Sequence, residues 1–73
     1  MVERLMPEMV PVDSDAIEEV GFDAGELVVK YRNGGTYVYF VVPESLFHEF
    51  MRSDSMGGFV NREIKPHYKC RKL

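Results

Sequence analysis

The sequence of 73 residues predicts a small α+β domain: a three-stranded antiparallel β-meander followed by an amphipathic helix and a second short helix packed on one face, with a basic C-terminal tail. Two β-rich runs flank Asn33-Gly34-Gly35, which indicates a hairpin, and the apolar residues after Pro43 recur at helical spacing. Hydrophobic residues make up 45% of the chain, which is typical of a compact domain rather than a disordered segment.

The chain is predicted to divide into a flexible N-terminal arm, residues 1–11, and a single domain, residues 12–73. The arm has no hydrophobic period and is interrupted by Pro7 and Pro11, which disfavour regular structure. It also lacks the unbroken apolar run of a signal peptide or a membrane span. We therefore expect no membrane association.

Three runs are expected to form the sheet: residues 16–22, 27–32 and 36–42. The register of the hairpin between the last two depends on the length of its loop, because a slip of one residue moves every side chain to the other face. A two-residue turn would place Tyr37 and Tyr39 beside Lys30 and Arg32, as an aromatic and basic platform. A three-residue loop with Gly35 in the left-handed conformation would turn both tyrosines toward the core. Asn-Gly-Gly permits either.

A helix is expected to begin at Pro43 and to end near Arg52, because proline suits the first turn and the apolar residues that follow form one stripe. Ser53, Asp54 and Ser55 supply capping oxygens, and Gly57-Gly58 allows a tight turn before a shorter helix that ends at Pro66. The predicted core joins the sheet to these helices. Its members are Ile17, Val20, Leu27, Val29, Tyr31, Tyr37, Tyr39, Val41, Leu46, Phe47, Phe50, Phe59 and Ile64.

Charge is distributed unevenly within the net charge of −3. Residues 1–26 hold eight acids against one base, and residues 27–73 hold eight bases against four acids. A basic segment is the electrostatic signature of phosphate binding, although a solvated tail that complements the acidic front is the plainer explanation. The bases that would contact nucleic acid are Lys30, Arg32, Arg62, Lys65, Lys69, Arg71 and Lys72.

The sequence offers little for catalysis, metals or cofactors, and we expect none of the three. Serines coexist with His48 and His67, but no spacing singles out a nucleophile and its base. Those histidines and Cys70 fall short of the four ligands of a structural zinc site. The single cysteine closes no intrachain disulfide, which fits a reducing, cytoplasmic location.

An ordered series of short motifs resembles the KTSC domain, over about residues 12–73. The motifs are Val12-x-Ser14, Val20-Gly21-Phe22-Asp23, Asn33-Gly34, Tyr37-x-Tyr39, Val42-Pro43, Ser55-x-Gly57-x-Phe59-x-Asn61, Ile64 and Tyr68. This short module occurs at the C-terminus of some lysyl-tRNA synthetases and as free-standing bacterial or phage proteins.

The resemblance implies a domain of unknown function with no catalytic residue, for which the synthetase fusions suggest RNA binding. It implies a structural role for the motif residues, and inward-facing tyrosines at positions 37 and 39, because the family tolerates polar residues between them. We therefore expect a small non-catalytic module that binds RNA, either tRNA or a single strand, as a monomer or weak homodimer. The alternative is a protein-interaction or assembly module with no nucleic-acid role, which would use the outer sheet face, the acidic front or the arm.

Overall fold

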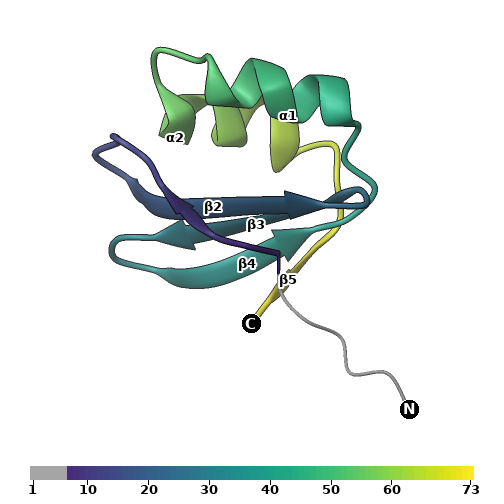
Figure 1. The fold of residues 1–73 in the computed structure, drawn as a ribbon, viewed down its shortest axis with the longest axis horizontal. Coiled ribbons are helices and arrows are strands. Elements are labelled where there is room, and N and C mark those ends of the chain that lie inside the picture. Colours follow the sequence, from purple (N-terminus) through teal and green to yellow (C-terminus); the bar gives the residue numbers. More distant parts are fainter. Residues whose placement is uncertain (1–6) are drawn as a thin grey trace.

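The computed structural model describes residues 7–73 as a five-stranded antiparallel sheet, in the order β1-β2-β3-β4-β5, with the helices on one face (Figure 1). The predicted α+β class is confirmed, and the prediction of three strands is wrong because two short edge strands join the meander. The elements are β1 (Val10–Pro11), β2 (Ile17–Asp23), β3 (Glu26–Tyr31), β4 (Gly35–Tyr39), α1 (Glu44–Met51), α2 (Met56–Phe59), the π-helix η1 (Val60–Ile64) and β5 (Cys70–Lys72).

The hairpin between β3 and β4 uses the three-residue loop. Tyr31 lies opposite Gly35, whose φ of +88° is the left-handed conformation that glycine adopts without strain. This register puts Tyr37 and Tyr39 on the face that carries Leu27 and Val29, under the helices. Tyr39 is only 1% exposed, whereas Tyr37 is half-buried at the margin of the core.

The core fills the layer between the sheet and the helices, and its predicted membership is correct except at Val41, which is 82% exposed. The next residue takes the inward position instead, because the Val42 amide donates to the Gly25 carbonyl and leaves Val41 as an extra, bulged residue. Val41 has a φ of +60°, which is strained for a β-branched side chain. Five buried residues were missed: Val28 and Val38 on the opposite sheet face, and Val42, Met56 and Val60.

Part of the predicted arm belongs to the sheet, since Val10 and Pro11 pair with β2 as strand β1. Residues 1–6 of that arm lie outside the described residues. The chain crosses the sheet face opposite the helices at Gly21, where a Cβ would lie 2.8 Å from Met9 Sδ and 2.9 Å from the Glu8 carbonyl oxygen. Glycine at position 21 is therefore what lets this segment pass so close to the sheet.

The predicted basic tail is not a free tail, because Cys70–Lys72 form strand β5 along β4. The Phe40 amide donates to the Lys69 carbonyl at 2.9 Å, and the Leu73 amide donates to the Thr36 carbonyl at 2.8 Å, so backbone pairing extends past both ends of the strand. All three residues of β5 are exposed. An exposed, charged strand of this length has none of the apolar alternation by which a strand is recognised in a sequence.

The helical layer follows the predicted capping pattern. Pro43 is the N-cap of α1, and Ser55 caps α2 by accepting a hydrogen bond from the Gly58 amide at 3.2 Å. Gly57 and Gly58 do not form the predicted turn and instead lie within α2. A Cβ on Gly57 would stand 3.0 Å from the Ala16 Cβ, so this glycine serves close packing of helix on sheet.

The strain at Val41 generates a first prediction. Val41→Gly is expected to raise the free energy of unfolding by up to about 1 kcal/mol, because relief of the left-handed strain exceeds the entropy that glycine adds to the unfolded chain. Little buried area is lost at a residue that is 82% exposed. Urea denaturation measures the change. Val10→Gly, in a strand with ordinary backbone geometry, is the control and should destabilise; a loss of stability in Val41→Gly would contradict the strain.

The crossing at Gly21 generates a second prediction. Gly21→Ala is expected to lower the free energy of unfolding by about 1–3 kcal/mol, since its methyl group must displace the backbone at Glu8. The same substitution in a chain that lacks residues 1–9 should be neutral or slightly stabilising, because glycine weakens a strand interior. An equal loss in both backgrounds would show that the crossing segment is not responsible.

Candidate functional site

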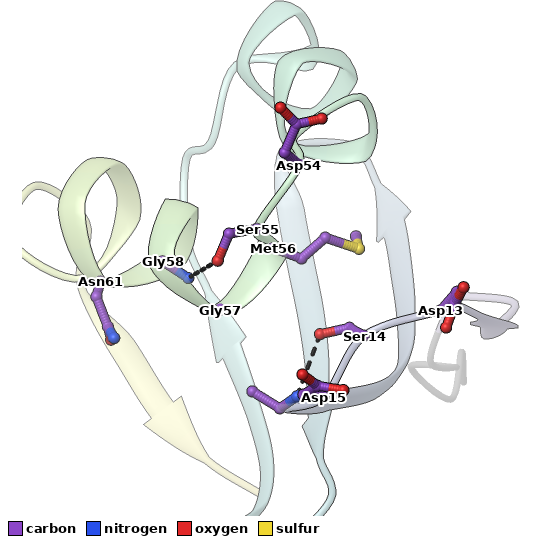
Figure 2. A pocket seen from close by; sticks show the side chains of 10 residues that line it. Asp13, Ser14, Asp15, Asp54, Ser55, Met56, Gly57, Gly58 and Asn61 are labelled. Atoms are coloured by element: carbon purple, nitrogen blue, oxygen red, sulfur yellow. Dashed lines mark hydrogen bonds between the residues drawn. The ribbon is translucent and has the colours of Figure 1, made fainter.

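Two neighbouring hollows bring together residues from distant parts of the chain. The first, here called the serine pocket, has a volume of about 400 Å³ and lies between the segment before β2 and the start of α2 (Figure 2). Its lining residues are Asp13, Ser14, Asp15, Ala16, Asp54, Ser55, Met56, Gly57, Gly58 and Asn61. Four of the predicted motif residues, Ser14, Ser55, Gly57 and Asn61, therefore share one pocket.

The two motif serines of this pocket are engaged by the backbone. Ser14 Oγ accepts from the amides of Ala16 and Ile17, each at 3.2 Å, and Ser55 Oγ accepts from the Gly58 amide (Figure 2). These bonds fix the entry to β2 and the start of α2, which are the roles that serine fills at turns and caps. None of the described residues that line the pocket is a histidine. The serines thus hold the local backbone in place.

Three aspartates also line the serine pocket, and they do not converge. Figure 2 shows Asp54 on the helix side of the pocket, away from Asp13 and Asp15 on the sheet side. Over residues 7–73, no group of three or more histidine, cysteine or acidic side chains is placed to hold a metal ion. The acidic rim makes the electrostatic potential of this pocket unfavourable for phosphate.

The second hollow, here called the tyrosine groove, has a volume of about 640 Å³. It lies on the helix-side face of the sheet, where the β3–β4 hairpin, the residue after η1 and strand β5 meet. Its lining residues are Ala16, Tyr31, Asn33, Gly34, Tyr37, Tyr39, Lys65 and Cys70. Ala16 also lines the serine pocket, so the two hollows adjoin.

The rings in the tyrosine groove hold one another in place. Tyr31 and Tyr37 pack edge to face, with centroids 5.8 Å apart and an interplanar angle of 76°. The hydroxyl oxygens of Tyr31 and Tyr39 lie 2.9 Å apart, which is a hydrogen bond. The Tyr39 ring is buried below, whereas Tyr31 and Tyr37 are half-buried and reach the groove.

Two lysines flank these rings. Lys65 Nζ lies 5.8 Å from the centroid of the Tyr31 ring, within the range of a cation–π contact. Lys72 pairs with Tyr37 across β4 and β5, so both side chains leave the sheet on the same face. The Lys72 chain runs along the hairpin, with its Cε 3.2 Å from where a Cβ on Gly35 would stand. The groove therefore combines aromatic surface with the ammonium group of Lys65, and Lys72 lies beside it.

The other predicted bases lie elsewhere. Lys30 Nζ is 3.8 Å from a carboxylate oxygen of Glu18, and Arg32 Nε donates to the Ser14 carbonyl at 2.8 Å. Arg71 pairs with Val38 and therefore faces the side of the sheet opposite the helices. Lys69 lines a shallow hollow with Phe40 and His67, and Arg62 Nη1 lies 2.9 Å from where a Cβ on Gly58 would stand. Of the seven bases, Lys65 lines the tyrosine groove and Lys72 lies beside it.

The remaining motif residues divide between the groove and the core. Asn33, Gly34, Tyr37 and Tyr39 line the groove, Phe59 and Ile64 are core residues, and Tyr68 packs against the core. Tyr31 and Cys70 were not predicted as groove residues. The sequence pattern placed Tyr31 in the core and Cys70 in a tail. For Tyr31 the sequence did hold a signal, because strand alternation places it on the same face of the sheet as Tyr37 and Tyr39.

Burial makes the two hydrogen-bonded tyrosines weaker acids than usual. It raises the pKa of Tyr31 above its ordinary value of 10.0, an effect that the hydrogen bond with Tyr39 opposes. Burial also raises the pKa of Tyr39, and there the hydrogen bond to Tyr31 adds to the rise. Both phenols are therefore neutral at physiological pH, and they supply hydroxyl groups rather than charge.

The chain belongs to the KTSC domain family, whose model matches residues 13–68. It is 40% identical over 64 residues to a protein of Tsukamurella paurometabola, covering 85% of this chain and 96% of that protein. It is 30% identical over 63 residues to an uncharacterized protein of Stutzerimonas stutzeri, with 82% and 89% coverage. The crystal structure of a KTSC domain protein from Yersinia pestis superposes with a TM-score of 0.87 at 36% identity, covering 93% of this chain and 99% of that one. The predicted family is confirmed.

The raised pKa values of Tyr31 and Tyr39 predict alkaline destabilisation. Below pH 10 the phenols are protonated in both states, and above it they ionise more readily in the unfolded chain, so the free energy of unfolding falls as pH rises. We expect the melting temperature to fall between about pH 9 and about pH 11. Tyr39→Phe should reduce the dependence of the melting temperature on pH in this range, whatever its effect on stability at neutral pH. An unchanged slope in that variant would contradict the assignment.

Proposed function

We propose that this domain is a non-catalytic module that binds single-stranded RNA, with the tyrosine groove as its binding site. The observation that carries the proposal is that half-buried Tyr31 and Tyr37 share one groove with Lys65, while Lys72 pairs with Tyr37 beside that groove. Proteins that bind single strands combine aromatic rings, on which bases stack, with cations that track the phosphates. The RNA binding suggested by the family resemblance agrees with this arrangement.

We expect the rings of Tyr31 and Tyr37 to have different roles in binding. One face of Tyr31 lies under Lys65 and its hydroxyl is bonded to Tyr39, so Tyr37 is the ring on which a base would stack. We expect the groove to accommodate a few nucleotides rather than a folded duplex, because Tyr31 and Tyr37 are the half-buried rings that line it and Tyr39 is buried. Stacking contributes about 1–3 kcal/mol per base, which corresponds to modest affinity for so short a site.

We expect electrostatics to determine on which side of the groove the phosphates of a bound strand lie. The chain carries a net charge of −3, so binding depends on local potential rather than on overall attraction. The serine pocket beside the groove carries Asp13, Asp15 and Asp54, which repel phosphate. We therefore expect the phosphates to follow the side of Lys65 and Lys72, away from that pocket, and we expect binding to weaken steeply as salt rises.

Absence of catalysis and a cytoplasmic location are part of the proposal. The hydroxyls of Ser14 and Ser55 accept backbone hydrogen bonds, which supports a structural rather than a nucleophilic role. The only cysteine, Cys70, is an exposed thiol, as is common in a reducing compartment. Among the described residues, no helix is long and apolar enough to span a bilayer.

One observation favours the alternative, a protein-interaction module. Val41 is 82% exposed in a strained backbone conformation, and it lines two shallow hollows of about 340 and 330 Å³. Strain of this kind persists where the surrounding structure imposes it, and it is enriched at functional sites. If the alternative is correct, Val41 and its neighbour Phe40 would contact the partner, and changing Val41 would weaken that contact.

A matched pair of double variants tests the RNA site. Lys65→Ala with Lys72→Ala removes two charges from the groove, and Lys30→Ala with Arg71→Ala removes the same charge from positions outside it. Titration of a labelled single-stranded RNA, followed by fluorescence anisotropy, should show at least about tenfold weaker binding for the groove pair only. The salt dependence of log K should fall by about 0.7 per lysine.

Equal losses in the two double variants would show that binding follows net charge and not the groove. Circular dichroism of both variants distinguishes either result from unfolding. If the wild-type protein does not bind RNA at low salt, the proposal is wrong and the protein-interaction alternative takes its place.

A further inference from the structure

The hydrogen bond between Tyr31 and Tyr39 has a direction that burial determines. The Tyr39 side chain is 1% exposed, and the Tyr31 hydroxyl is the one partner that residues 7–73 offer to its own hydroxyl. If Tyr31 donated, the Tyr39 proton would remain buried without an acceptor. A buried donor without a partner is far less favourable than an unused lone pair. Burial thus favours Tyr39 as the donor and Tyr31 as the acceptor.

The direction of this bond leaves the proton of Tyr31 available. Tyr31 lines the tyrosine groove and is half-buried, and within the described part of the chain its hydroxyl bonds only to Tyr39. A hydroxyl that accepts a hydrogen bond becomes a better donor, because the two bonds polarise each other. The hydrogen bond opposes the rise in the pKa of Tyr31 and adds to that of Tyr39, as this direction requires.

We propose that the Tyr31 hydroxyl is a preoriented donor that selects bases with an exocyclic oxygen, such as uracil, over bases with an amino group in the same position, such as cytosine. This inference rests on the proposed function and names its base preference. An exocyclic oxygen accepts the Tyr31 proton. An exocyclic amino group is a donor and offers no lone pair, so it gives the Tyr31 proton no acceptor.

The orientation of the base follows from the position of the lysines. Lys65 lies over one ring and Lys72 beside the other, so a strand that holds its phosphates near these ammonium groups keeps its sugars outside the rings. A pyrimidine then enters the groove with the edge remote from its sugar. That edge carries an exocyclic oxygen in uracil and an exocyclic amino group in cytosine. A phosphate could also accept the Tyr31 proton. A phosphate that lay among the rings would lose its hydration, which is unfavourable for a charged group.

The test compares short oligouridine, oligocytidine and abasic strands of equal length at neutral pH, using fluorescence anisotropy. The wild-type protein is expected to bind oligouridine about fivefold more tightly than oligocytidine, the difference that one hydrogen bond provides, and to bind the abasic strand least. Tyr31→Phe should keep stacking and lose the preference. Tyr39→Phe should bind with a reduced preference, because the freed Tyr31 hydroxyl can then rotate and accept a hydrogen bond.

Each outcome separates the two proposals. If the wild-type protein binds none of the strands, both are wrong. If it binds oligouridine and oligocytidine equally and the abasic strand weakly, the RNA module stands and the donor role of Tyr31 fails. If the abasic strand binds as well as oligouridine, the groove holds phosphate, which also overturns the base preference. The comparison of the wild-type affinities needs no variant to fold.

Discussion

The loop of the β3–β4 hairpin is the constraint on which the rest of this structure depends. Gly35 adopts a φ of +88°, which closes a three-residue loop and places Tyr31 opposite it. That register directs Tyr37 and Tyr39 toward the helices, where one completes the core and the other borders the groove. A shift by a single residue would send both rings to the opposite face and would remove the groove.

Much of the fold could be predicted because its signals are local. Alternation identified β3 and β4, and the apolar stripe after Pro43 identified α1. The loop length remained open, since Asn-Gly-Gly suits two turns. Strands β1 and β5 were missed because each is short and is defined by its partner strand rather than by its own residues. Val41 was misassigned because the bulge that expels it depends on the bond from Val42 to Gly25.

The candidate site was harder to predict than the fold. Counting bases found Lys65 and Lys72, but the count could not separate them from Arg71, which alternation within β5 sends to the other face. Recognition of β5 as a strand would have been sufficient to separate Arg71 from Lys72. The aromatic residues of the site could not be predicted for a different reason. A tyrosine at the margin of a core is both a packing residue and a surface residue. Tyr31 and Tyr37 fill both roles.

The position of β5 has a consequence for folding. Strands β2, β3 and β4 are joined by short connections, so their pairing closes small loops, whereas β5 reaches β4 only after a connection that contains every helix. Closing the longer loop carries the greater entropy penalty, and such contacts generally form late. The meander can thus assemble before Cys70 and Lys72 arrive to complete the groove. The proposed binding surface is therefore a property of the finished fold, absent from partly folded chains whose hairpin has already formed.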